Sequence, residues 1–341
     1  MPEPKSPFDI GNQNPSITER NEPANTSLSG WQPPAPQNQQ PPGLEHKMDP
    51  LPVVDQVPTF DGGMQTYKPA GKLTGRKALI TGGDSGIGRA TAVLYAMEGA
   101  EVMITYLPGE DKDAEATRKM VAERGGKIHV WEADLRTKEK CKETVDQALK
   151  NMGKINILVN NHAFQYMRET ILDIPEDQWL KTFDTNIHRK WRRLVPVWDA
   201  KNKFRLTNPP AAFFYLSKYT LPHMTKGDTI INDASVNAYI GRPDLLDYTS
   251  TKGAIVSFTY GLSNQWVSKG IRVNAVAPGP VWTPLVVATM TEDSQKSFSG
   301  PIGRGAQPSE IATVFVFLAS TDSSQISGQV IHANGGVVVA G

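Results

Sequence analysis

The chain has 341 residues, enough for more than one average domain and fewer than three. Its 36 Lys and Arg against 35 Asp and Glu give a net charge of +1, which argues against a nucleic-acid-binding protein with a basic footprint. The single cysteine, Cys141, excludes an internal disulfide and a structural zinc site and favours a reducing compartment. No apolar run follows Met1, and no stretch reaches the roughly 18 apolar residues of a membrane span. We therefore expect a cytoplasmic protein that binds neither membranes nor nucleic acid.

The first part of the chain is rich in proline. Residues 1–70 hold 14 of the 26 prolines, and 31–43 is a low-complexity run. Such a composition buries too little apolar area to offset its ordering entropy, so residues 1–43 are predicted to be a disordered arm. A polyproline ligand for a partner is the functional alternative to a plain tail. Residues 44–72 carry more apolar side chains, and we expect them to lie extended over the surface of the domain.

Strands and helices alternate from residue 73 to the end. Short apolar runs predict strands at 78–81, 102–106, 128–131, 155–160, 229–232, 271–277 and 329–331. Helical patterns lie between them, the first three at 89–98, 112–123 and 137–151. This alternation predicts an α/β domain with a parallel sheet covered by helices on both faces.

A glycine-rich turn, TGGDSGIG over residues 81–88, joins the first strand to the first helix. It places bare backbone and a helix N-terminus where a pyrophosphate can bind. A tight turn without a ligand is the alternative, but the TGxxxGxG spacing has its strand and helix where dinucleotide binding requires them.

Tyr248 and Lys252 are four residues apart and would share one face of a helix. A free tyrosine has a pKa near 10, and a neighbouring ammonium lowers it, so the pair could act as general acid/base on a carbonyl–alcohol couple. Ser235 follows a buried strand, and its hydroxyl could hold a substrate oxygen at the same point. Asp134 follows the third strand and could accept from an adenine amino group or simply cap a helix.

Taken in order, TGGDSGIG, Asn160-Asn161, Asn186, Ser235, YTSTK at 248–252 and NAVAPG at 274–279 resemble the short-chain dehydrogenase/reductase family. The resemblance covers residues 73–341, and the proline-rich lead resembles a bacterial and fungal branch of uncharacterised, stress-associated oxidoreductases. It implies a single Rossmann-type, doubly wound parallel sheet that binds NAD or NADP. It also implies an enzyme that interconverts an aldehyde or ketone and an alcohol, often as a homotetramer or dimer.

The resemblance also assigns roles by motif. Tyr248 would exchange a proton with the substrate oxygen, Lys252 would bind the nicotinamide ribose and lower the tyrosine pKa, and Ser235 would orient the carbonyl. Asn186 would hold a water in the proton relay. The expected contacts to the cofactor come from Thr81, Gly82, Asp84, Ser85, Gly86, Ile87 and Gly88, from Asp134, Leu135 and Asn160, from Tyr248 and Lys252, and from Pro278, Gly279, Val281 and Thr283.

Two departures from the family pattern stand out. The chain reads Asn160-Asn161-His162-Ala163 where the family has NNAG, and no second ligand lies beside His162 to suggest a metal site, so none is expected. The second strand ends in Tyr106-Leu107-Pro108, with neither the acid that selects NAD nor the arginine that selects NADP. The choice between the two cofactors therefore stays open.

Residues 189–212 form an insertion between two halves of a helical pattern, with seven basic residues and one acidic residue. A nucleic-acid or membrane-surface loop and a lineage-specific loop are two interpretations. The preferred hypothesis is a retained intron, because codons for Arg189-Lys190-Trp191 can contain a 5′ splice consensus and those for Ala211-Ala212 can end in AG. If the insertion is translated, a catalytically impaired NAD(P)-binding protein acting as a redox sensor or scaffold is the alternative function. The substrate is not predictable from the sequence.

Overall fold

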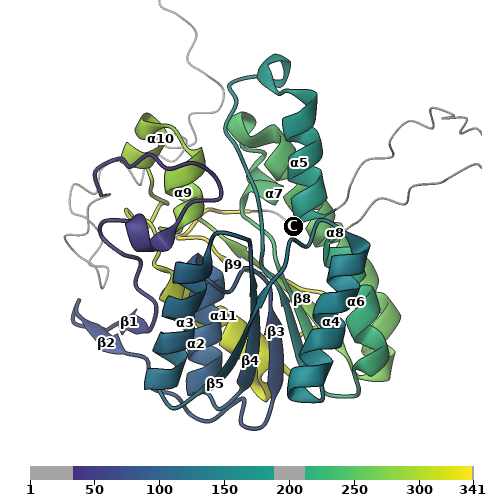
Figure 1. Ribbon diagram of the computed structural model, residues 1–341. Helices are drawn as coiled ribbons and strands as arrows, with labels where there is room; N and C mark the ends of the chain where they lie inside the picture. The colour runs from purple at the N-terminus through teal and green to yellow at the C-terminus, as the bar shows by residue number, and fades with distance from the viewer. Residues whose placement is uncertain (1–33, 188–211, 340–341) are drawn as a thin grey trace, which may run out of the picture.

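The computed structural model describes residues 34–187 and 212–339 (Figure 1). Within them, seven strands pair in parallel in the order β5-β4-β3-β6-β7-β8-β9, which confirms the predicted sheet. Their bounds are β3 (Lys77–Ile80), β4 (Glu101–Tyr106), β5 (Lys127–Glu132), β6 (Ile157–Asn160), β7 (Thr229–Asp233), β8 (Arg272–Pro278) and β9 (Val330–Ala333). The strand order reverses between β3 and β6. In open α/β sheets the carboxyl ends of the strands at such a point form the ligand crevice.

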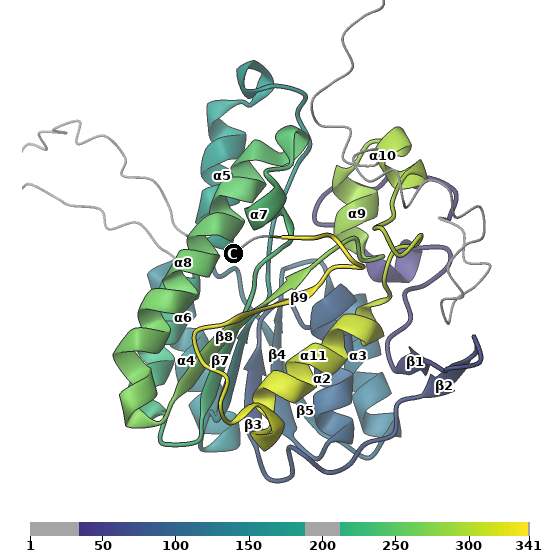
Figure 2. The same cartoon turned by 180° about the vertical axis from the view of Figure 1, so that it is seen from behind.

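Helices cover both faces of the sheet (Figures 1 and 2). One face carries α2 (Gly86–Met97), α3 (Asp111–Glu123) and α11 (Pro308–Ala319). The other carries α4 (Lys138–Met152), α6 (Ala212–Thr220) and α8 (Leu246–Trp266), with α5 (Glu176–Asn186) packed on α8. The remaining elements are short: α7 (Asn237–Ile240), α9 (Pro284–Thr289) and α10 (Glu292–Lys296), and the 3₁₀ turns η3 (Ile171–Asp173), η4 (Leu221–His223), η5 (Pro243–Leu245), η6 (Val267–Lys269) and η7 (Thr321–Ser323).

Side chains that alternate along the strands fill two cores, one on each face. Ala78 and Ile80 of β3 pack with α2 and α11, whereas Leu79 packs with α4 and α6 on the opposite face. Both faces are apolar, as expected of a sheet with helices on either side. No helix in the described ranges is both long and apolar enough to cross a bilayer.

Most predicted element boundaries differ from the structure by one or two residues, and the largest difference is at the start of the first helix. The first helix, predicted from residue 89, begins at Gly86, because the glycines that lower helix propensity are held in the first turn by their contacts. The insertion predicted at 189–212 lies outside the described residues except for Ala212, the first residue of α6.

The segment that precedes the domain is also held against it. Residues 34–43, predicted as part of a disordered arm, contact α9 and α10: the Gln37 N–H donates to Gln295 Oε1 at 3.0 Å and the Gln39 N–H to the Val287 oxygen at 3.1 Å. The prediction was wrong there because it counted apolar area, whereas amide hydrogen bonds hold this stretch.

Residues 44–72 were predicted to lie extended on the surface, and part of them is folded. They contain the 3₁₀ turn η2 (Glu45–Lys47) and an antiparallel pair of β1 (Gln56–Pro58) and β2 (Met64–Thr66). Glu45 and Met48 are buried rather than superficial. From here on, "the arm" means residues 34–58, the segment described in contact with the domain, and no longer the predicted arm at residues 1–43.

The buried cysteine gives a first testable prediction. Cys141 on α4 is fully buried and donates to the Leu135 oxygen at 3.2 Å, and burial raises the pKa of its thiol to about 12. The thiolate is the reactive form, so we expect the native protein to react with a thiol reagent only after unfolding. Ellman's reagent should titrate about one thiol in guanidinium chloride and almost none under native conditions. Rapid native labelling would contradict this packing.

Candidate active site

A cavity of about 530 Å³ lies at the carboxyl ends of strands β3 to β8, at the point where the strand order reverses. Its lining includes most of the residues predicted from the sequence, from segments up to about 200 residues apart in the chain: Gly82, Asp84, Ser85, Gly86, Ile87, Asp134, Leu135, Ser235, Tyr248, Pro278, Gly279, Val281 and Thr283. The structure therefore brings the glycine-rich turn and the proposed acid/base group to one cavity.

The glycine-rich turn has the geometry of a dinucleotide cradle. Gly82 and Gly86 have φ angles of +60° and +52°, which other residues rarely adopt. A Cβ on Gly88 would overlap the carbonyl oxygen of Gly82 and lie 2.5 Å from Asn161 Nδ2, so only glycine lets α2 pack this closely on β3. Gly88 itself does not line the cavity and acts through packing. The bare turn fits the pyrophosphate of a dinucleotide.

Thr81, Asn160 and Lys252 are further predicted cofactor contacts that do not line the cavity. Thr81 is buried, and its Oγ1 accepts from the Asn161 N–H at 3.0 Å, so it braces the loop after β6. Asn160 is fully buried and donates to Asn232 Oδ1 on β7 at 2.9 Å, so its side chain joins two strands. Its predicted contact with the ribose stays a prediction and would fall to its backbone. The side chain next to it, Asn161, lines the cavity and donates to the Gly82 oxygen at 3.0 Å.

Tyr248, Lys252 and Ser235 form one cluster. Tyr248 and Lys252 lie on adjacent turns of α8, with the Lys252 nitrogen 5.3 Å from the centre of the Tyr248 ring. Ser235 follows β7 and lines the same cavity as Tyr248, and its hydroxyl favours the phenolate form of that tyrosine. The Ala234 N–H donates to Val276 and the Val236 N–H donates to Pro278, which holds the serine in place against β8. Tyr248 lines the cavity, whereas Lys252 is fully buried behind it.

The acidity of Tyr248 departs from the prediction. Burial raises the pKa of Tyr248, and the charge of Lys252 only partly opposes that rise. The predicted lowering of this pKa by Lys252 is present, but the spacing of the two residues does not show the depth of burial that outweighs it. The oxidised nicotinamide ring carries a positive charge, so a bound cofactor would favour the phenolate further.

Asp233, at the end of β7, is a site residue that sequence reasoning missed. The Lys252 ammonium donates to its backbone oxygen at 2.7 Å and lies 3.4 Å from its carboxylate. Burial disfavours the ammonium, but the charges of Tyr248 and Asp233 outweigh this and hold the pKa of Lys252 above its usual value. Asp233 Oδ1 is buried without a hydrogen-bond partner, and the residue lines the cavity. The sequence signal that could have identified it as a site residue is its position two residues before Ser235, at the end of the same strand.

Asn186 lies at the end of α5, away from the cavity wall. Its side-chain oxygen accepts from the Phe164 N–H at 2.6 Å. Its side-chain nitrogen donates to the Phe164 oxygen at 2.8 Å and to Thr251 Oγ1 at 3.0 Å. The side chain thus fixes the loop after β6 to α8. Its predicted role in a proton relay stays a prediction and would fall to its backbone carbonyl.

The adenosine end of the cavity carries further carboxyl groups. Asp134, predicted to contact adenine, lines the cavity and receives hydrogen bonds from Arg136 at 2.8 and 3.0 Å. Glu110, not predicted, accepts from the Leu107 N–H at 2.9 Å. Burial raises the pKa of Glu110 to about 8 and that of Asp84 to about 6. Asp84 and Glu110 lie beside the end of β4, where the ribose 2′-position is read in this fold.

His162 has a structural role. Its Nδ1 is hydrogen-bonded to Thr81 Oγ1 at 2.7 Å, and its ring packs edge-on against Phe213. Burial lowers the pKa of His162 to about 3, so the ring is neutral at physiological pH. Across the described part of the chain, no group of three His, Cys, Asp or Glu side chains could hold a metal ion.

A glycine-cradled dinucleotide cavity with a Ser–Tyr–Lys cluster at its far end defines a Rossmann-type, NAD(P)-binding oxidoreductase. The short chain dehydrogenase family model matches residues 76–190, and the enoyl-(acyl carrier protein) reductase model matches residues 210–338. The chain belongs to the short-chain dehydrogenase/reductase family, and its cofactor is NAD or NADP.

Named relatives cover nearly the whole chain. It is 46% identical over 320 residues to glucose and ribitol dehydrogenase of Daucus carota, covering 92% of this chain and 99% of the relative. It is 44% identical over 306 residues to NADPH-dependent aldehyde reductase 1, chloroplastic, of Arabidopsis thaliana, covering 87% and 96%. A short chain dehydrogenase from Burkholderia cenocepacia, solved in complex with NADP, superposes with a TM-score of 0.65 at 26% identity, covering 78% and 98%.

Proposed function

We propose that this protein reduces an aldehyde or ketone to an alcohol, and catalyses the reverse oxidation, with Tyr248 as the general acid and base. The observation that carries the proposal is that Tyr248 and Ser235 line the same cavity as the glycine-rich turn, with the Lys252 ammonium buried behind the tyrosine ring. When bound, the nicotinamide supplies the hydride for reduction and takes it up in oxidation.

The chain's own groups account for the proton. In reduction, the Tyr248 hydroxyl donates its proton to the oxygen of the carbonyl, and the phenolate left behind is stabilised by the Lys252 ammonium. The Ser235 hydroxyl, which also accepts from the Asn237 N–H at 3.1 Å, orients the substrate oxygen. In oxidation the same phenolate removes the hydroxyl proton of the alcohol. Each direction transfers one proton at Tyr248 and one hydride.

The names of the relatives support a substrate class. One is called an aldehyde reductase and another a glucose and ribitol dehydrogenase. We therefore propose small aldehydes, including the open-chain forms of sugars, and the matching polyols as substrates. A homo-oligomeric state and a cytoplasmic location stay predictions.

The assay follows nicotinamide absorbance at 340 nm with the purified chain, a panel of short-chain aldehydes and aldoses, and NADH or NADPH. We expect oxidation of the cofactor that depends on the carbonyl compound, with turnover within the usual range of about 1 to 10³ per second for a good substrate. Heat-denatured protein is the control. Cofactor binding without turnover on any member of the panel would contradict the proposal and favour the sensor or scaffold alternative.

A further inference from the structure

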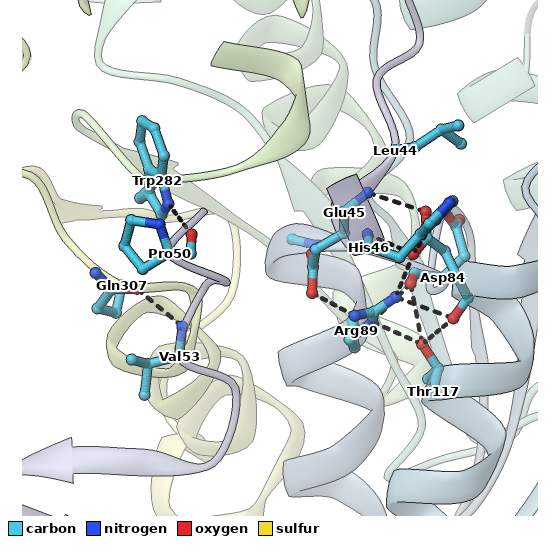
Figure 3. A network of polar contacts seen from close by, with 12 residues as sticks. Leu44, Glu45, His46, Pro50, Val53, Asp84, Arg89, Thr117, Trp282 and Gln307 are labelled. Carbon is cyan, nitrogen blue, oxygen red and sulfur yellow. Dashed lines mark hydrogen bonds and ion pairs between the residues drawn. The ribbon is translucent and has the colours of Figure 1, made fainter. Parts of the chain in front are cut away.

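The arm reaches the glycine-rich turn through the side chain of Glu45 (Figure 3). This carboxyl group is only 1% exposed. Its Oε2 accepts from the Gly86 N–H, in the first residue of α2, at 2.6 Å, and its Oε1 pairs with the Arg89 guanidinium one turn further on. An arm residue thus contacts the backbone of the predicted pyrophosphate cradle.

Arg89 connects the same carboxyl group to the rest of the turn. Its Nε donates to the Asp84 oxygen at 2.7 Å and to Thr117 Oγ1 at 2.9 Å. Its Nη2 donates to the Asp113 oxygen on α3 at 3.0 Å. Glu45 and Arg89 together therefore hold both the beginning of α2 and the residue at the centre of the glycine-rich turn.

The backbone of the arm is fastened at the same place. The N–H groups of Glu45 and His46 each donate to the Asp113 carboxylate at 2.9 Å. Burial raises the pKa of Glu45 to about 7, against the opposing charge of Arg89, so the group is ionised in mildly alkaline solution.

Anchors on both sides of Glu45 keep the arm in register. On the C-terminal side of Glu45, Trp282 donates to the Pro50 oxygen at 3.0 Å, and the Val53 N–H donates to Gln307 at 2.9 Å (Figure 3). On its N-terminal side, Pro41 and Pro42 line the cavity itself. The arm is therefore part of the cavity wall as well as a support for the turn.

We propose that Glu45 is a positioning residue of the dinucleotide site, and that its hold on Gly86 and Arg89 makes the affinity for NAD(P) depend on the seated arm. The inference rests on the dinucleotide site of the proposed function. A helix N-terminus binds phosphate best when its N–H groups are fixed in direction. Glu45 fixes the start of α2 at Gly86 and orients the Arg89 side chain, which in turn holds the Asp84 oxygen in the turn. Coupling of this kind is reciprocal. Cofactor binding must therefore stabilise the docked position of the arm by the same factor by which the docked arm raises the affinity for the cofactor.

The first test compares Glu45→Ala with Asp55→Asn at pH 8, where Glu45 is ionised. Asp55 is a matched control because it is an acidic residue of the same arm whose ion pair with Arg124 lies away from the turn, and the bonds at Glu45, His46, Pro50 and Val53 keep the arm seated without it. NADH and NADPH are titrated by their fluorescence, and KM values are measured for cofactor and carbonyl separately. For Glu45→Ala we expect the Kd and KM for cofactor to rise about tenfold or more, with kcat and carbonyl KM nearly unchanged, and for Asp55→Asn no such split.

The second test needs no variant. Hydrogen exchange of the wild-type amides at residues 44–48 should slow about tenfold at saturating cofactor, together with those at 85–89. Unchanged exchange at 44–48 would overturn the proposal, as would a Glu45→Ala variant with wild-type affinity. Tighter cofactor binding by Glu45→Ala would also overturn it, because the carboxyl group would then compete with phosphate for the Gly86 N–H. If the wild type binds neither cofactor, the proposed function fails instead.

Discussion

Replacing Tyr248 by phenylalanine should lower kcat by about 10² to 10⁴-fold while leaving the Kd for cofactor nearly unchanged. The hydroxyl is the group placed to exchange a proton with the substrate, since Tyr248 lines the cavity together with Ser235. Removing it deletes the acid and base without opening a cavity, since the ring remains. Steady-state kinetics in both directions and cofactor titration check this together.

Tyr260→Phe is the matched control, because that residue lies on the same helix and its side chain is 40% exposed. It should keep wild-type kcat. Activity of Tyr248→Phe within a few fold of the wild type would refute the role given to this residue.

The same tyrosine predicts the pH dependence. Oxidation needs the phenolate, and burial raises the Tyr248 pKa above its usual value, so the rate of alcohol oxidation should climb with pH through the neutral and alkaline range. Reduction needs the protonated hydroxyl and should stay level until alkaline pH. The rise in oxidation rate should vanish in Tyr248→Phe.

Gly88→Ala should weaken cofactor binding, with a Kd at least about tenfold higher, and should lower thermal stability. A methyl group there would overlap the Gly82 oxygen and lie 2.5 Å from Asn161 Nδ2, both of them fixed groups of the cradle. Relief requires α2 to move from β3, and overpacking of this kind costs about 1–3 kcal/mol. Cofactor titration and a thermal melt with and without cofactor measure both effects.

Gly261→Ala is the control for this substitution, because a Cβ at Gly261 on α8 meets no atom within 4 Å. It should hold or raise the melting temperature, since alanine favours a helix over glycine. If Gly88→Ala binds cofactor as the wild type does, the close packing of α2 on β3 is not what shapes the cradle.

The parts of the fold that follow from local pattern were predicted well. Short apolar runs alternating with helical patterns predicted the parallel sheet, and the TGxxxGxG spacing predicted where its ligand crevice lies. Both signals depend only on residues that are close in sequence. The Tyr248–Lys252 spacing likewise placed two groups on one helix face.

What sequence reasoning missed depends on contacts between distant segments. Asn160 and Asn161 are the same residue type at consecutive positions, so the sequence does not tell their roles apart. In the structure, the side chain of the first bonds within the sheet and that of the second lies at the cavity. The net rise of the Tyr248 pKa follows from burial depth, which spacing does not reveal. Glu45 contacts Gly86 across 41 residues, and a proline-rich composition gave no sign of it.

The most direct test of the account is transfer of label from cofactor to substrate. The wild-type chain is given a reactive aldehyde with NADH or NADPH carrying deuterium at C4 of the nicotinamide, and the alcohol product is analysed by mass spectrometry and NMR. We predict one deuterium on the carbinol carbon from one face of the nicotinamide, and labelled product that forms about 10² to 10⁴-fold more slowly with Tyr248→Phe. Tight binding of the cofactor with no deuterium transferred by the wild-type chain to any aldehyde or ketone would contradict the assignment of this cavity as a carbonyl–alcohol active site.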